Sequence, residues 1–226
     1  MIGYMQSLRK RVYYVKGRCM FFDGTNFIST SAFGLPQTFV ISMWVRQLAA
    51  PGGSTCLFMY GDVSAGVALY TRTGAYPTDT LVIAYGIGTS TPAQINTGYS
   101  LTKPDLSHIA LVYDYSIDKF RFFVNFSEIP IPAHNLSNWV RNFNSASIAS
   151  NKGATNFKGH VFDFRINSTA NIPQQHLFAA DIVHLNLDEQ SGNIAVDSSP
   201  FARNAILSNP KTSTFYYGTD VPSFNW

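Results

Sequence analysis

The sequence predicts an all-β protein that folds as an antiparallel two-sheet jelly-roll sandwich. Apolar residues recur at every second position over many short segments, turn-forming residues separate these segments, and helical patterns are scarce. Ten or more short strands divided by turns are typical of such a sandwich. The 226 residues provide enough chain for one large domain, and no linker or internal repeat divides them.

The alternation is clearest in four segments, each with one apolar face that can cover a core. These segments are Thr38–Arg46, Ser107–Asp114, Lys119–Phe126 and Phe157–Ile166. The last one is predicted to place four side chains on one side, those of His160, Phe162, Phe164 and Ile166. Shorter strands are predicted at Cys19–Phe22, Phe27–Thr30, Cys56–Tyr60, Val67–Arg72, Thr80–Tyr85, Ile182–Leu187 and Thr214–Tyr217. Short helices are expected only at Ile172–Asp181 and Asn135–Phe143.

Positive charge is concentrated at the N-terminus. Residues 1–18 hold five of the 16 basic residues and no acid, which leaves 11 basic residues against 13 acids in the rest of the chain. We therefore divide the chain into a basic N-terminal arm, residues 1–18, and a domain, residues 19–226. The arm is predicted to dock on an acidic protein surface rather than on nucleic acid, the alternative being a solvated basic end. Its docking residues would be Arg9, Lys10, Arg11, Lys16 and Arg18.

Composition argues against several classes of protein. Charged residues make up 13% of the chain, about half of the usual ~25%, which does not suit a disordered tail or a coiled coil. No apolar run reaches the ~18 residues of a membrane-spanning helix, so membrane insertion is not expected. Residues 1–18 do not resemble a secretory signal, because no apolar stretch follows the charges.

The chain shows no pattern of catalytic or zinc-binding residues. Its only glutamates are Glu128 and Glu189, whereas a glycosidase normally needs two carboxyl groups across the scissile bond. The histidines lack zinc-ligand spacing, and Cys19 and Cys56 lie in apolar surroundings that suit buried thiols. We therefore predict that the protein is not an enzyme.

Five segments in succession resemble the laminin-G-like, concanavalin A-like lectin jelly-roll family. The second of them carries Trp44, which matches the family's core tryptophan. The third has Phe126 where the family's hairpin has glycine, so a two-residue turn with positive φ is not expected there. The segments are Phe21–Ser31 (FFDGTNFISTS), Phe39–Arg46 (FVISMWVR), His108–Glu128, Lys158–Ile166 (KGHVFDFRI) and Leu187–Leu207.

The resemblance implies candidate binding residues. Calcium is the family's usual metal, and Asp23 and Asn26 are the candidate ligands, although turn formation is the stronger interpretation of both residues. No other cofactor is expected. Sugar rings stack on aromatic side chains, and the aromatic residues predicted to lie in or beside loops are Tyr76, Tyr99 and Trp139. The aromatic C-terminus is predicted to dock on a partner through Tyr216, Tyr217 and Trp226.

The resemblance also implies a role, by analogy of fold. The predicted function is that of a non-enzymatic structural and adhesion protein of a virion, such as a bacteriophage capsid-decoration, head-fibre or tail component. Its partners would be other virion proteins in an oligomer or a large assembly, with cell-surface glycans as further ligands. The alternative is a secreted, extracellular carbohydrate-binding lectin module, and the third hypothesis is a degenerate glycosidase.

Overall fold

The computed structural model confirms the predicted all-β architecture. In the part of the chain that it describes, regular structure consists of strands β1 to β16, without a helix. Accordingly, no helix long and apolar enough to span a membrane occurs among these residues. The described residues are 18–48, 53–72, 80–101, 106–141, 145–150, 157–169, 181–187, 189, 191–208 and 215–217.

The first sheet, sheet A, is antiparallel and has the strand order β10-β9-β8-β3-β12-β1-β16, with β13 pairing β12 beside this path. β1 and β13 pair with different halves of the long strand β12, so they lie one after the other along the same edge of it. The strands are β1 (Arg18–Asp23), β3 (Phe39–Gln47), β8 (Ser107–Asp114), β9 (Lys119–Val124), β10 (Ser127–Ile129), β12 (Lys158–Asn167), β13 (Asp181–Leu185) and β16 (Phe215–Tyr217).

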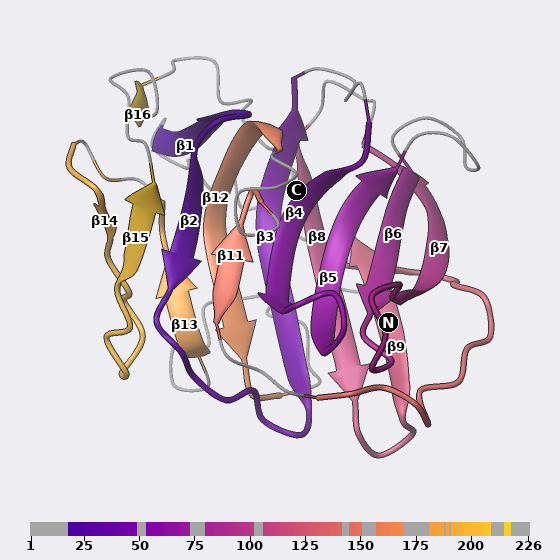
Figure 1. Cartoon of the computed structure of the whole chain (residues 1–226). Helices are drawn as coiled ribbons and strands as arrows, with labels where there is room; N and C mark the ends of the chain where they lie inside the picture. Colours follow the sequence, from indigo (N-terminus) through magenta and orange to yellow (C-terminus); the bar gives the residue numbers. More distant parts are fainter. Residues whose placement is uncertain are drawn as a thin grey trace, which may run out of the picture.

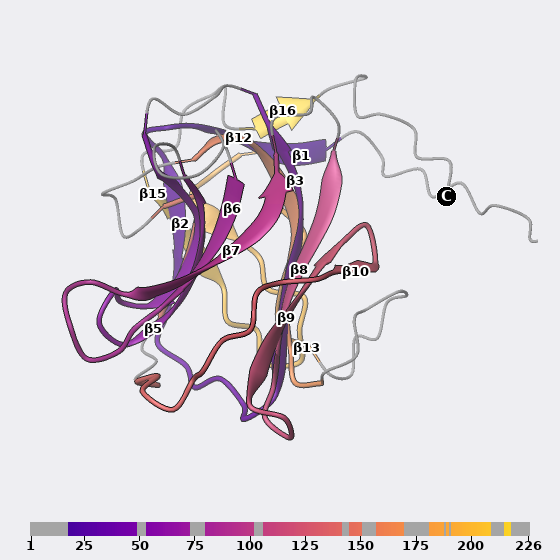
Figure 2. The same cartoon turned by 90° about the vertical axis from the view of Figure 1, so that its right-hand side faces the viewer.

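The second sheet, sheet B, has the order β14-β15-β2-β11-β4-β5-β6-β7. It lies in front of sheet A in Figure 1, and the side view in Figure 2 shows the two sheets as facing layers. Its strands are β2 (Phe27–Thr30), β4 (Thr55–Gly61), β5 (Gly66–Arg72), β6 (Thr80–Tyr85), β7 (Ala93–Ser100), β11 (Ala146–Ile148), β14 (Ile194–Ala195) and β15 (Ala205–Ser208).

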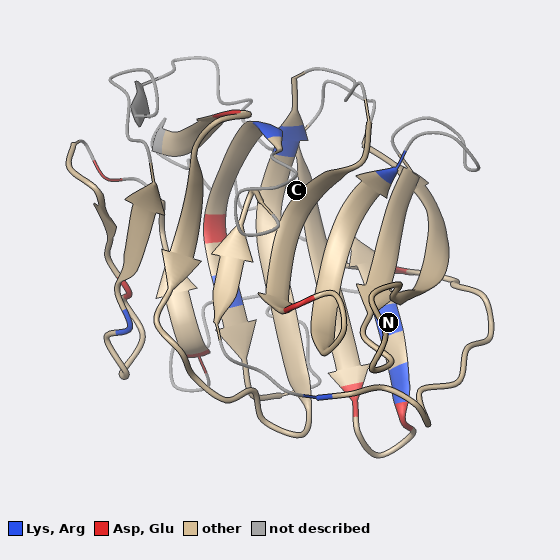
Figure 3. Ribbon diagram, viewed as in Figure 1, with Lys and Arg blue, Asp and Glu red and all other residues tan. Residues whose placement is uncertain are grey.

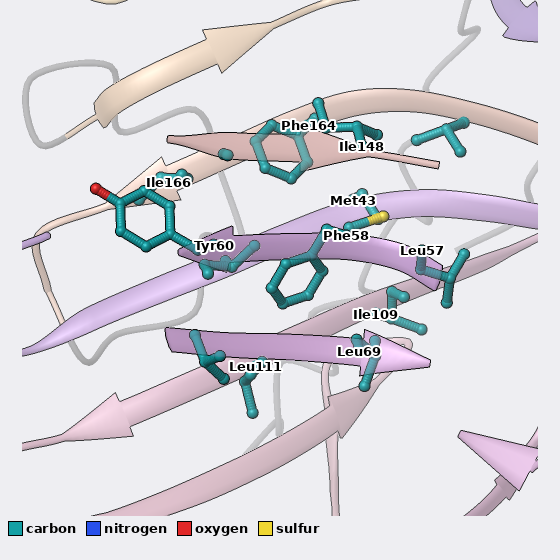
Figure 4. Close-up of a cluster of buried hydrophobic side chains, with 14 of the residues drawn as sticks. Met43, Leu57, Phe58, Tyr60, Leu69, Ile109, Leu111, Ile148, Phe164 and Ile166 are labelled. Atoms are coloured by element: carbon teal, nitrogen blue, oxygen red, sulfur yellow. The ribbon is translucent and has the colours of Figure 1, made fainter. Parts of the chain in front are cut away.

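The core fills the space between the two sheets. Both sheets contribute alternate apolar side chains to one cluster of buried residues, and Figure 4 shows strands of both sheets meeting there. The alternation predicted for β3 is confirmed, because its odd-numbered residues, Phe39, Ile41, Met43 and Val45, all belong to this cluster. A sandwich with a continuous apolar core follows from these paired faces.

The alternation predicted for β12 is wrong in its first half. The register shifts between Phe162 and Arg165, and Asp163 adopts a left-handed backbone conformation with φ of 50°. The irregularity turns His160 and Phe162 away from the side on which Phe164 enters the core. A β-bulge inserts one residue and thereby reverses the faces of a strand.

The turn between β9 and β10 also differs from the prediction. Asn125 and Phe126 have φ of 48° and 66°, and Val124 pairs directly with Ser127. This is the two-residue hairpin that Phe126 was expected to prevent. The Asn125 side chain supports it, because its Oδ1 accepts the N–H of His108 at 2.9 Å while its own N–H donates to the carbonyl of His108 at 2.8 Å.

The two predicted helices are not observed in the described residues. Residues 135–141 contain a turn but no helix, so the prediction for Asn135–Phe143 is wrong over this range. Ile172–Asp181 lies outside the described residues apart from Asp181, which begins β13. Neither segment has the long apolar stripe from which a helix gains stability by packing.

Charged residues are scarce on the strands of sheet B and gather in turns and at strand ends (Figure 3). Among the strands described for this sheet, Arg72 is the only charged residue. Charged groups of this part of the molecule are therefore found mainly at the ends of the sandwich.

Candidate functional site

One end of the sandwich carries a group of aromatic and charged side chains. It lies at the bottom of Figure 1, where β8 ends, the turn 115–118 leads into β9, and residues 139–141 pass close by. We call this group the rim cluster and define it by its five residues, Tyr113, Tyr115, Asp118, Trp139 and Arg141.

The Arg141 guanidinium is the centre of the rim cluster. Its Cζ lies 4.5 Å from the ring centroid of Tyr113, 4.6 Å from that of Trp139 and 5.7 Å from that of Tyr115. A cation within about 6 Å of an aromatic ring is attracted by the electron-rich ring face. Three rings therefore hold this guanidinium, and its side chain remains 32% exposed.

Asp118 fixes the guanidinium from the other side. Nη2 of Arg141 donates to Oδ1 of Asp118 at 3.2 Å and also to the hydroxyl of Tyr113. The Tyr113 hydroxyl donates to the same Oδ1 at 2.7 Å. Burial and this hydrogen bond raise the pKa of Tyr113 to about 12, so Tyr113 keeps the proton that it donates.

The turn 115–118 presents Tyr115 at the surface. Asp114 Oδ1 accepts the N–H and the hydroxyl of Ser116, and the N–H of Asp118 donates to the carbonyl of Tyr115 at 3.3 Å. The N–H of Tyr115 donates to Thr38 Oγ1 at 3.2 Å. These contacts fix a turn whose tip leaves the Tyr115 side chain 50% exposed. Tyr115 was not among the binding residues predicted from the sequence.

Sheet B positions the other half of the rim cluster. Trp139 Nε1 donates to the carbonyl of Gly66 at 2.8 Å, and the N–H of Val140 donates to the carbonyl of Gly86 at 2.9 Å. A Cβ at Gly86 would lie 2.3 Å from backbone atoms of Ser64 and Ala65, so only glycine permits this close approach. The cluster is thus built by both sheets.

The arrangement suits a neutral, hydroxyl-bearing ring. A half-exposed aromatic side chain can stack against an apolar ring face, while a carboxylate and a guanidinium can accept and donate hydrogen bonds. Their geometry is fixed before any ligand arrives, which reduces the entropy lost on binding.

A second exposed aromatic ring, that of Phe201, is a weaker candidate for a sugar-binding site. Phe201 is 58% exposed, and the guanidinium of Arg203 lies 4.3 Å from its ring centroid. The exposed apolar side chains of this region are those of Ile194, Val196 and Ile206, and its exposed polar side chains are those of Ser191, Asn193, Ser198 and Asn204. Arg203 donates to the carbonyl of Ile182 at 2.9 Å and forms no ion pair with another described residue. This ring therefore lacks the fixed pair of carboxylate and guanidinium that lies beside Tyr115, and the rim cluster is the better candidate.

Asp163 and Asp181 lie in one largely buried cluster of charged residues, but their arrangement does not suit a catalytic pair of carboxyl groups. Arg165 Nε donates to Asp163 Oδ1 at 2.8 Å, and its Nη1 lies 3.5 Å from Asp181 Oδ2. His184 Nε2 lies 2.9 Å from the same Oδ1 of Asp163, and Asn167 donates to Asp181 at 3.0 Å. The Asp181 side chain is 1% exposed, so it is not presented to a substrate.

The pKa values of the two aspartates diverge. Burial would raise the pKa of Asp163, but the hydrogen bond from His184 and the charge of Arg165 outweigh burial and hold it below its usual value. Burial raises the pKa of Asp181, and Arg165 offsets this only in part. Because the more accessible acid is the one held ionised, the cluster lacks an accessible general acid of raised pKa.

A row of rings crosses the face of sheet A that points away from the core. Trp44 pairs in register with Phe162 on one side and with His108 on the other, and its ring stacks on Phe162 at 5.8 Å. His108 stacks on Phe126 at 4.4 Å. Its Nδ1 is buried without a hydrogen-bond partner among the described residues, and burial lowers the pKa of His108 to about 4.

A comparison with protein families identifies the fold family. Residues 22–175 match the model of the concanavalin A-like lectin/glucanases superfamily. The chain belongs to this superfamily. The resemblance seen in the sequence is therefore confirmed, whereas a comparison with curated proteins found no match.

Several solved structures share this fold at low sequence identity. A candidate carbohydrate-binding protein from Bacteroides ovatus is 18% identical with a TM-score of 0.61 over 84% of this chain, which spans only 59% of that protein. Domain 4 of the arabinanase AbnA from Geobacillus stearothermophilus, solved with arabinotriose, is 18% identical with a TM-score of 0.54, covering 73% and 79%. The SAP-like pentraxin from Limulus polyphemus is 11% identical with a TM-score of 0.52, covering 73% and 82%.

The structure corrects one of the three predicted stacking residues of this concanavalin A-like domain. Trp139 is 7% exposed and belongs to the core, where its ring packs against the Arg141 guanidinium instead of facing a ligand. Tyr99 is half-buried, and its hydroxyl lies 3.0 Å from Ser107 Oγ. Tyr76 lies outside the described residues.

Most of the predicted docking residues lie outside the described residues, namely Arg9, Lys10, Arg11, Lys16 and Trp226. The backbone of the C-terminal segment pairs within the same chain, since Arg18 lies opposite Tyr217 and Cys19 lies opposite Tyr216 in the β1–β16 register. The division into a basic arm and a domain remains a prediction, as does docking through the arm.

The loop proposed for calcium forms a compact turn. Asp23 Oδ1 accepts the N–H and the hydroxyl of Thr25, and Asn26 Oδ1 accepts the N–H of Asp23 at 2.9 Å. Across the described ranges, no three His, Cys, Asp or Glu side chains are grouped so that they could hold a metal ion. Calcium binding by Asp23 and Asn26 stays a prediction.

Proposed function

We propose that this concanavalin A-like domain is a non-catalytic carbohydrate-binding module and that the rim cluster is its binding site. The observation that carries the proposal is the half-exposed Tyr115 ring beside the fixed pair of Arg141 and Asp118. Stacking on the ring would hold the apolar face of a sugar, and the charged pair would bind its hydroxyl groups. The sugars associated with related folds support this choice of ligand.

Replacing Tyr115 by alanine is expected to weaken glycan binding roughly tenfold or more, because the stacking surface is lost. The fold should tolerate the change, since the side chain is exposed and contributes little to the core. The measurement is a glycan array with the purified chain, followed by calorimetric titration of the best ligand with each variant.

Phe201→Ala is the matched control, because it removes another exposed ring far along the sequence from the rim cluster. It should leave the affinity unchanged. Absence of binding to every glycan on the array would refute the proposed function, and full affinity in Tyr115→Ala would refute the assignment to the rim cluster.

We further propose that the module is displayed on a virion, with an extracellular location as the alternative. The support is the basic arm of the sequence, with five cations and no acid in residues 1–18. Deleting residues 1–18 should release the protein from purified particles and leave glycan binding intact. Retention of the truncated chain in particles at the wild-type level would contradict arm-mediated docking.

A further inference from the structure

We propose that the rim cluster selects neutral sugars over acidic ones. This inference rests on the proposed function and adds the class of ligand. Arg141 alone would favour a carboxylate ligand, because guanidinium groups bind carboxylates strongly. The arrangement around Arg141 argues for the opposite preference.

The positive charge of Arg141 is already matched. Asp118 forms an ion pair with it at 3.2 Å, and Tyr113 completes the contact by donating to the same carboxylate oxygen. The neighbouring charges also cancel, since Asp114 lies opposite Lys119 in the β8–β9 register. An acidic ligand would therefore meet a locally neutral surface with no cation to spare.

The carboxylate is the more accessible member of the pair. The side chain of Asp118 is 51% exposed and that of Arg141 is 32% exposed. The guanidinium packs against the rings of Tyr113 and Trp139, which restricts the directions from which a ligand can reach it. A ligand carboxylate that approached Arg141 would come close to Asp118, and like charges in this partly desolvated setting repel.

A hydroxyl group of a ligand can bind Asp118 and Arg141 at the same time. It can donate its hydrogen to the Asp118 carboxylate and accept a hydrogen bond from Arg141, whereas an ionised carboxylate can only accept. The Asp118 carboxylate is accessible, and of its two oxygens only Oδ1 accepts a hydrogen bond from other described residues. The cluster is thus complementary to a neutral sugar that stacks on Tyr115.

The test compares neutral oligosaccharides with uronic-acid counterparts of the same backbone on one array, using the full chain. The wild-type protein is expected to bind the neutral member of each pair at least tenfold more tightly. Asp118→Asn removes the repelling charge, and asparagine tolerates the φ of 49° at this position. This variant is expected to gain affinity for the acidic oligosaccharides, so that the ratio of its affinities for the neutral and acidic members of a pair is no more than threefold.

Glu128→Gln is the matched control, because it neutralises an exposed carboxylate that pairs with Arg121 instead of Arg141. It should leave the ratio unchanged. Equal or tighter binding of acidic members by the wild type would overturn this inference alone, as would an unchanged ratio in Asp118→Asn. Absence of binding to every neutral and acidic member would overturn the proposed function as well.

Discussion

Replacing Arg165 by methionine is expected to lower the free energy of unfolding by about 3 to 5 kcal/mol. Arg165 is buried and holds Asp163 at 2.8 Å and Asp181 at 3.5 Å. Methionine keeps most of the side-chain volume but leaves the buried Asp181 without its cation, and an uncompensated buried charge is costly. Denaturant unfolding followed by tryptophan fluorescence measures the loss.

Two variants separate the electrostatic cause from lost packing. Arg121→Met breaks an exposed pair with Glu128 and should cost no more than about 1 kcal/mol. Arg165→Met combined with Asp181→Asn removes the stranded charge, and it should be more stable than Arg165→Met alone because interacting residues are not additive. A double variant as unstable as the sum of its single substitutions would contradict the ion-pair explanation.

Replacing His108 by phenylalanine is expected to make the protein more resistant to acid. Burial lowers the pKa of His108 to about 4, from the ordinary histidine value of 6.5. Between these values the unfolded chain binds a proton that the folded chain does not, so stability is full above pH 6.5 and falls as the pH drops towards 4. At pH 5 the free energy of unfolding of His108→Phe should therefore exceed that of the wild-type protein by on the order of 2 kcal/mol.

The substitution suits the site, because His108 already stacks on Phe126 and meets Trp44 edge-on. Its Nδ1 has no hydrogen-bond partner to lose among the described residues. Urea unfolding of both proteins at pH 8 and at pH 5 is the measurement, and pH 8 is the internal control at which the two stabilities should be similar. An identical loss on acidification in both proteins would show that His108 is not the group responsible. His160, whose pKa burial also lowers to about 4, would be tested next.

Period-two alternation predicted the long strands well because each of them has one face in the core. The segments 39–47 and 107–114 form strands with the predicted core faces. Strand β7 was not predicted, since its residues Ala93–Ser100 are mixed in polarity and only partly buried. The short strands β10, β11, β14 and β15 were missed too, since two to four residues do not establish a period.

The bulge in β12 shows where a periodic pattern stops being informative. Nothing local in FDFR requires the extra residue, and the left-handed Asp163 is stabilised by contacts that come from elsewhere in the chain. Those contacts are the His184 ring and the carbonyl of Asn186, to which the N–H of Asp163 donates at 3.0 Å. Such tertiary contacts are invisible to a reading of one strand.

The rim cluster was missed for a related reason. Asp118 lies in the turn between β8 and β9, but its partner Arg141 is 23 residues further on and carries no motif. Trp139 was predicted to lie in or beside a loop, whereas its indole is buried in the core and donates a hydrogen bond to Gly66. The tyrosine at the tip of a polar turn, Tyr115, was the one available signal.

The pairing of β16 with β1 has a consequence for how this module could be attached to something larger. Both strands lie at the top of the molecule in Figures 1 and 2, and the turn that carries Tyr115 lies at the bottom. A tether joined before Arg18 or after Tyr217 would thus leave from the pole opposite the proposed sugar site. Several modules anchored side by side in this way would all point their sites outward, which favours multivalent capture of a repetitive surface.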